Sequence, residues 1–128
     1  MPLTANLRFF RLDEFRHPEL VEAEAAHFLD DVRAAYGQPL VLTSDARTPE
    51  ENAAASGSSP TSLHLAGRAF DLRWIQNPAA LWRFVKAVYQ IAGNRGVELE
   101  LVNSKQDQHI HLALLPIQGG SRLLIRAD

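Results

Sequence analysis

Strict alternation of apolar and charged residues over residues 97–101, within the apolar-ended run 97–102, is the feature that most restricts the fold of this chain. In a β-strand, successive side chains point to opposite faces, so Glu98 and Glu100 would form a solvated face. The apolar members of the alternation would face a core: Val97, Leu99 and Leu101. A polar turn over residues 103–108 then leads to a second strand over residues 109–114. The chain is therefore expected to build a sheet with one buried face.

Two longer segments have the 3.6-residue periodicity of amphipathic helices. The first is predicted to begin at Pro18 and end at Gly37, and the second to begin at Pro78 and end at Gly93, because Pro favours the first turn and Gly the end of a helix. The shorter predicted elements are strands over residues 39–43, 67–74 and 121–125, a helix over residues 49–55 and a loop over residues 56–62. We predict an α+β fold, in which a small antiparallel sheet packs against two main helices.

Length and composition exclude several classes of protein. The 128 residues suit a single domain over residues 1–128, and 46% hydrophobic residues argue against disorder. A formal charge of −2 with dispersed arginines lacks the basic stripe of a nucleic-acid-binding protein. Since no run approaches the roughly 18 apolar residues of a membrane span, we expect no membrane insertion. We expect a monomer.

The stretch from Ser62 to Asp71 carries the most specific chemistry in the chain. His64 lies at the end of a loop, and Asp71 belongs to the strand that follows, so both side chains can converge on one ion. His109 and His111 are two residues apart, which places them on the same face of a strand. Because the chain has no cysteine, a transition metal would be held by histidine and carboxylate. Three such ligands are the usual number for a catalytic zinc.

Other interpretations of these residues remain open. Burying a charged carboxylate in an apolar strand costs folding free energy unless the charge has a partner. Asp71 therefore requires either a metal or a salt bridge from an arginine such as Arg47. Arg47 could equally pair with Asp45. Ser62 either lines a site or only caps a turn. Two further histidines are expected to lie outside the site: His17 and His27.

Several motifs together resemble one family. The pattern Ser-x-His-x-x-Gly-x-Ala-x-Asp over residues 62–71, followed by His-x-His at 109–111, resembles the zinc D-Ala-D-Ala peptidases and phage endolysins of the peptidase M15 family. This family belongs to a wider group that includes lysostaphin-type peptidases and hedgehog domains. Residues 42–52 are similar to its T-S-x-x-R-x-x-x-x-N segment, and residues 9–15 to its F-x-L-x-E-F segment. The resemblance covers roughly residues 7–115 and implies a fold like that of hedgehog and D-Ala-D-Ala peptidase domains.

The resemblance also implies roles for individual residues. It implies three ligands for a Zn²⁺ cofactor: His64, Asp71 and His111. His109 would stabilise the tetrahedral intermediate or carry a proton. Arg47 would hold a carbonyl or carboxylate of the substrate, and Ser62 would bind substrate at the edge of the site. The implied substrate is a peptide from peptidoglycan crosslinks, hydrolysed by a water molecule that the zinc activates.

One position departs from the pattern of this group. Its members often have an acidic residue three positions before the last zinc ligand as the general base, whereas this chain has Gln108 there. The base would then be Asp107 or His109. The first hypothesis is therefore a cell-wall peptidase, either a D-Ala-D-Ala carboxypeptidase or an endolysin-type endopeptidase. The second is a non-catalytic zinc-binding module, for example a structural or tail component of a phage.

The N-terminal residues 1–8 lack the basic and apolar regions of a secretory signal. We therefore expect a protein that is made in the cytoplasm and acts at the cell wall after lysis or as part of a virion.

Overall fold

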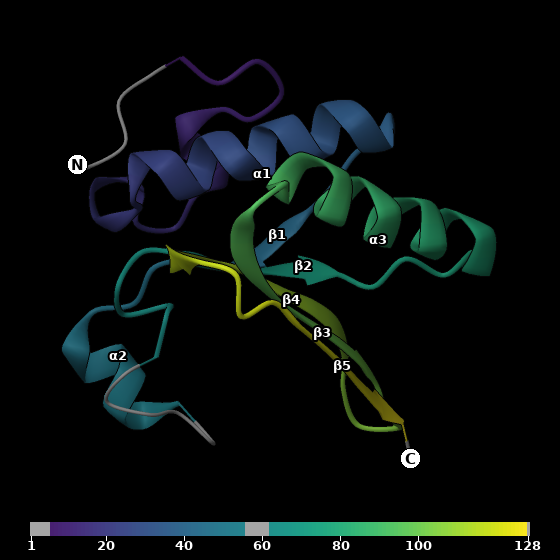
Figure 1. Ribbon diagram of the computed structural model, residues 1–128. Helices are drawn as coiled ribbons and strands as arrows, with labels where there is room; N and C mark the ends of the chain where they lie inside the picture. Colours follow the sequence, from purple (N-terminus) through teal and green to yellow (C-terminus); the bar gives the residue numbers. More distant parts are fainter. Residues whose placement is uncertain (1–5, 56–61, 128) are drawn as a thin grey trace.

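A five-stranded sheet forms the centre of the computed structural model, which describes residues 6–55 and 62–127. The strands are β1 (Leu42–Ser44), β2 (Ala69–Arg73), β3 (Arg95–Asn103), β4 (Gln108–Gln118) and β5 (Arg122–Ala127). They lie side by side in the order β1-β2-β4-β3-β5 (Figure 1). The strands that carry Asp71 and His111 are therefore neighbours, and β3 lies directly beside the second of them. Residues 56–61 of the loop predicted over residues 56–62 lie outside the described residues.

One strand pair differs from the predicted antiparallel sheet. All neighbouring strands run antiparallel except β3 and β5, which are parallel. The chain reverses after β4 at Gly119 and Gly120, whose φ angles are 73° and 74°, so β5 runs opposite to β4 and in the same direction as β3. Because β4 already has β2 and β3 as neighbours, β5 pairs with the remaining edge of β3. The expectation of a wholly antiparallel sheet was wrong at this edge.

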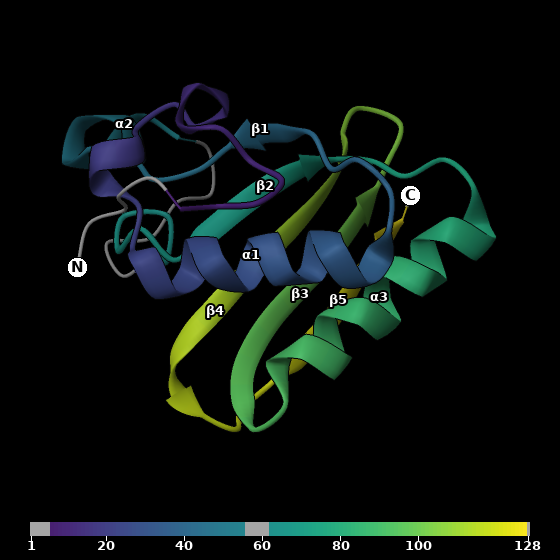
Figure 2. The same ribbon diagram turned by 90° about the horizontal axis from the view of Figure 1, so that it is seen from above.

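Two helices, α1 (Ala23–Tyr36) and α3 (Pro78–Ala92), cover one face of the sheet (Figures 1 and 2). The alternating residues of the strands meet the apolar faces of these helices. The largest buried side chains of this core include Phe28, Leu29, Phe84, Val88, Phe70, Leu99, Ile110 and Leu112. The predicted α+β fold with a sheet against two main helices is confirmed. Within residues 6–55 and 62–127, no helix has both the length and the apolar character needed to cross a membrane.

The first helix begins later than its periodicity predicts. Pro18 starts a 3₁₀ turn (Pro18–Leu20), and α1 begins only at Ala23. Between them the chain is extended at Glu22, whose backbone N–H donates to the carbonyl of Gly67 at 2.8 Å. A hydrogen bond to a residue distant in the sequence therefore interrupts the helix. The short helix α2 (Pro49–Ala54) lies apart from α1 and α3 (Figure 1) and has the predicted proline in its first turn.

Gly67 is required where the loop after His64 meets the N-terminal segment. Its φ angle is +73°, and a Cβ at this position would lie 2.1 Å from the carbonyl oxygen of Leu20. Only glycine adopts this backbone conformation without strain and also permits such a close approach. The contact fixes the path of the chain between His64 and β2.

Replacing Gly67 with alanine is expected to destabilise the protein strongly. The left-handed backbone alone costs about 1–3 kcal/mol for a residue with a side chain, and the overlap with the Leu20 carbonyl adds to this loss. Denaturant unfolding of the variant measures the change in the free energy of unfolding. Gly37→Ala is the matched control, because Gly37 has a φ of +81° but no atom within 4 Å of the added Cβ. Equal losses in the two variants would contradict the close approach.

Candidate metal centre

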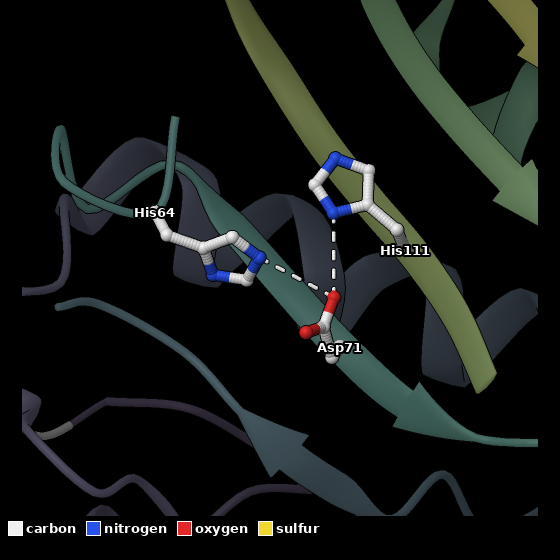
Figure 3. Close-up of side chains that lie close together, drawn as sticks. All are labelled: His64, Asp71 and His111. Atoms are coloured by element: carbon white, nitrogen blue, oxygen red, sulfur yellow. Dashed lines mark hydrogen bonds and ion pairs between the residues drawn. The ribbon is translucent and has the colours of Figure 1, made fainter. Parts of the chain in front are cut away.

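The polar face of the sheet brings together three side chains from two strands and one loop. Asp71 on β2 lies opposite His111 on β4 in the antiparallel register. His64 reaches the same point from the loop that precedes β2, and Figure 3 shows both histidine rings directed at the Asp71 carboxylate. Nε2 of His64 and Nδ1 of His111 each lie 3.3 Å from Oδ1 of Asp71. The structure thus brings together the three predicted metal ligands.

These distances fit a tetrahedral metal ion. Two ligand atoms at the usual zinc distances of about 2.1 Å are separated by about 3.4 Å at the tetrahedral angle, close to the two measured separations of 3.3 Å. One ligand atom from each residue of the trio lies within 4.8 Å of the others. The donor set of two imidazoles and one carboxylate also suits zinc. The three residues could therefore hold a metal ion together.

A backbone carbonyl orients His64. Its Nδ1 lies 2.7 Å from the carbonyl oxygen of Asp45, so this nitrogen carries the hydrogen and leaves Nε2 free to face Asp71. The His64 carbonyl in turn accepts from the backbone N–H of Arg47 at 3.0 Å. The Asp45 carboxylate accepts the backbone N–H groups of Arg16 and His17, which anchors the end of β1. Such partners are common for metal-binding histidines because they hold the ring orientation.

A carboxylate orients His111 in the same manner. Its Nε2 lies 2.9 Å from Oε1 of Glu98 on β3, and the Glu98 carboxylate also accepts from the guanidinium of Arg122 on β5. The side chain of Glu98 is only 19% exposed. The interpretation of Glu98 as part of a solvated face was wrong: the residue does point away from the core, but the face it occupies is the one that carries the site.

Opposing effects set the ionisation of this cluster. Burial raises the pKa of the Asp71 carboxyl, but its hydrogen-bond and charge interactions with the His111 and His64 side chains outweigh burial and hold that pKa below its ordinary value. Burial lowers the pKa of His111, whereas Asp71 and Glu98 raise it to a net value above the ordinary one. The pKa of Glu98 is lowered, because Arg122 and His111 outweigh its burial. The anionic carboxylate of Asp71 is thus available as a ligand.

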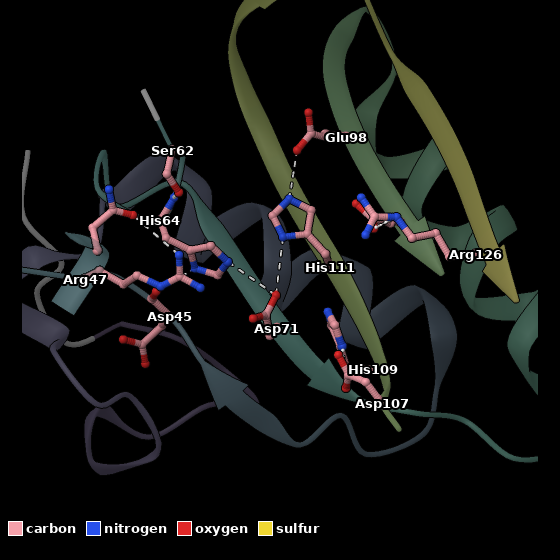
Figure 4. A network of polar contacts seen from close by, with 12 residues as sticks. Asp45, Arg47, Ser62, His64, Asp71, Glu98, Asp107, His109, His111 and Arg126 are labelled. Carbon is pink, nitrogen blue, oxygen red and sulfur yellow. Dashed lines mark hydrogen bonds and ion pairs between the residues drawn. The ribbon is translucent and has the colours of Figure 1, made fainter. Parts of the chain in front are cut away.

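An open cleft of about 1110 Å³ lies over this face of the sheet and includes the trio and the other predicted site residues. His109 projects from β4 on the same side as His111, and its Nδ1 lies 3.0 Å from Oδ1 of Asp107 (Figure 4). Asp107 therefore orients His109 and leaves the Nε2 of that ring for the cleft. Neither residue belongs to the group of three with metal-ligand spacing.

Arg47 and Ser62 lie at the end of the cleft beside His64. The Arg47 side chain contacts Oδ1 of Asn52 at 3.5 Å and, in the part of the chain that the structure describes, forms no ion pair with Asp71 or Asp45. The salt-bridge interpretation of Arg47 was therefore wrong. Oγ of Ser62 accepts the backbone N–H of His64 at 3.2 Å, so this residue caps the turn as well as lining the cleft.

The remaining candidates lie at the rim or outside the site. Gln108 lines the cleft, but its side-chain amide donates to Oδ1 of Asn103 at 2.6 Å. His17 pairs with Glu51, its Nε2 lying 2.8 Å from Oε1 of that residue, and His27 is exposed on α1. As predicted, neither of these histidines joins the trio.

Comparison with known proteins adds one finding. The sequence model for the family described as peptidase M15 matches residues 10–113. A comparison with curated proteins gives no match. The matched segment contains His64, Asp71, His109 and His111, whereas β5 and its arginines lie beyond it.

Proposed function

The chain belongs to the peptidase M15 family, and we propose that it is a zinc-dependent peptidase that hydrolyses crosslink peptides of peptidoglycan. The observation that supports the proposal best is the spacing of His64, Asp71 and His111, whose ligand atoms lie within 4.8 Å of one another, with both histidines 3.3 Å from the Asp71 carboxylate. Three protein ligands leave one position for water or substrate, as in catalytic zinc sites. The cleft over the trio gives a peptide access to that position.

In the proposed reaction the side chains around the trio have separate tasks. A zinc ion held by the trio would polarise a carbonyl group of the peptide and lower the pKa of water to about 7. His109, oriented by Asp107, moves the proton between the attacking water and the leaving amine through Nε2. Arg47 binds a carbonyl or carboxylate of the peptide, because it lines the cleft and, among the residues that the structure describes, its side chain makes one long contact, with Asn52. Ser62 lines the same end of the cleft and contributes to substrate binding.

The test is the release of products from purified peptidoglycan by the zinc-loaded protein. Free D-alanine would identify a D-Ala-D-Ala carboxypeptidase, whereas larger peptide fragments would identify an endolysin-type endopeptidase. A protein prepared without metal is expected to be inactive and to regain activity when zinc is added. Zinc-loaded protein that releases neither product would overturn the proposed activity. In the cell, such an enzyme would reach the wall after lysis or within a virion.

A second candidate function is a non-catalytic zinc-binding module with the same fold, such as a structural or tail component of a phage. It is favoured by Gln108, which stands where the family often has an acid and whose amide is engaged by Asn103. Under this proposal, the protein takes up zinc but releases nothing from peptidoglycan. Hydrolysis by the wild-type protein that depends on His109 would exclude it.

A further inference from the structure

We propose that Glu98 and Arg122 form a positioning pair that holds the His111 ring in the orientation needed for metal binding. The proposal deepens the proposed function and rests on the metal site described above. It assigns a role to two residues that the family resemblance does not include, and one of them, Arg122, lies outside the segment that matches the family.

The two nitrogens of the His111 ring have opposite partners. Nδ1 lies 3.3 Å from the Asp71 carboxylate, and Nε2 lies 2.9 Å from Glu98. Figure 4 shows Asp71 and Glu98 on opposite sides of the ring. A metal held on the Asp71 side would use Nδ1 as its ligand atom, and the hydrogen of the neutral ring would then be on Nε2, where Glu98 accepts it. Glu98 therefore acts through His111 and is itself outside the group with metal-ligand spacing.

The two histidines of the trio differ in what holds them. His64 donates to the backbone carbonyl of Asp45, a group that the fold itself fixes. His111 depends on a side-chain carboxylate, which can rotate unless it has an anchor of its own. Strand β5 supplies that anchor, because Arg122 lies directly opposite Glu98 in the parallel register and its guanidinium donates to the Glu98 carboxylate. The edge strand thus completes the support of the third ligand.

Strands β3 and β5 share a second Arg–Glu ion pair, which can be compared with the pair of Glu98 and Arg122. Four residues further along β5, Arg126 forms an ion pair with Glu100 on β3 at 2.8 Å. Both arginines are largely exposed, with 60% and 71% of their side-chain area accessible to solvent. Glu98 contacts a ligand of the trio, whereas the Glu100 carboxylate pairs with Arg126. If these arginines served only to attach β5, removal of either would have the same consequence.

The experiment measures zinc affinity of the full chain by competition with a chromogenic chelator. Glu98→Ala is expected to weaken zinc binding by about 10–100-fold, the usual effect of losing an outer partner of a ligand. Arg122→Ala should weaken it less, and should cause no additional loss in the Glu98→Ala background. Glu100→Ala and Arg126→Ala, the matched controls, should bind zinc like the wild type. Glu98→Gln keeps an acceptor oxygen and should give an intermediate loss, which provides a second test if Glu98→Ala does not fold.

A spectroscopic measurement separates positioning from general stability. In the cobalt-substituted protein, the visible absorption bands report the geometry of the ligands. These bands should change in the Glu98→Ala and Arg122→Ala variants and remain unchanged in Arg126→Ala. Equal zinc affinities for Glu98→Ala and Glu100→Ala, or for Arg122→Ala and Arg126→Ala, would overturn the proposal. Wild-type protein that binds zinc but does not cleave peptidoglycan contradicts only the enzymatic function, whereas wild-type protein that takes up no zinc contradicts both.

Discussion

Replacement of Asp71 by asparagine is expected to weaken zinc binding by more than about 100-fold, since loss of an outer partner alone costs about 10–100-fold. Asp71 is the only anion in the trio, and both histidines are directed at its Oδ1 atom. Asparagine has nearly the same shape but offers a neutral amide in place of the charged ligand. The measurement is zinc content after dialysis, together with competition against a chelator. Release of peptidoglycan products should disappear with the metal.

Asp107→Asn is the matched control for this change. It makes the same chemical substitution in a carboxylate of the same cleft that lies outside the trio. We expect the Asp107→Asn protein to retain zinc. Retention of zinc by Asp71→Asn at wild-type affinity would contradict the metal site, whereas loss of zinc in both variants would indicate a general electrostatic effect of the cleft.

Replacement of His109 by alanine is expected to reduce peptidoglycan hydrolysis by about 10²–10⁴-fold, the usual contribution of a positioned acid or base. Zinc affinity should remain near that of the wild type, because the three ligands and their partners are unchanged. The rate of product release and the zinc content should be measured on the same preparation. Added imidazole should restore part of the activity by filling the space left by the side chain.

His27→Ala is the control for this second change, because His27 is exposed on α1, away from the cleft. Its activity and zinc content should match those of the wild type. Full activity in the His109→Ala protein would show that another group carries the proton, and Asp107 would then be tested next. Activity lost together with zinc would instead place His109 among the residues that hold the metal.

Local sequence patterns predict which face of each strand the candidate side chains occupy, whereas the choice of His64, Asp71 and His111 as the ligands came from the family resemblance. A period of two along a strand places His109 and His111 on one face, and one apolar strand carries Asp71. An antiparallel pairing of these strands then brings Asp71 opposite His111, as the structure has it.

The partner of His111 could not be predicted, because it depends on the order of strands in the sheet. Alternation correctly places Glu98 away from the core, but a strand that faces solvent and a strand that faces a site have the same pattern. Glu98 meets His111 because β3 pairs with β4, and it meets Arg122 because β5 pairs in parallel with the free edge of β3. Both pairings join separate segments of the chain, so the pattern of residues within either segment does not predict them.

Tertiary contacts also explain the smaller differences. The periodicity that starts at Pro18 continues across Glu22, yet the hydrogen bond from its backbone N–H to Gly67 interrupts the helix. Similarly, Arg47 and Asp45 are close in sequence, but the Asp45 carboxylate is engaged by the backbone N–H groups of Arg16 and His17. In each case a distant segment competes with a local interaction and replaces it.

Side chains of the core and side chains of the candidate site alternate along β4, so the register of this strand determines both packing and site geometry. Ile110 and Leu112 are fully buried, while His109 and His111, which alternate with them, face the cleft. A slip of this strand by one residue would turn the histidines into the core and expose the two apolar side chains. Misregistered molecules would therefore be both unstable and unable to assemble the trio. Core packing therefore stabilises only the register in which the histidines face the cleft, so the energetics of folding also select the correct geometry of the site.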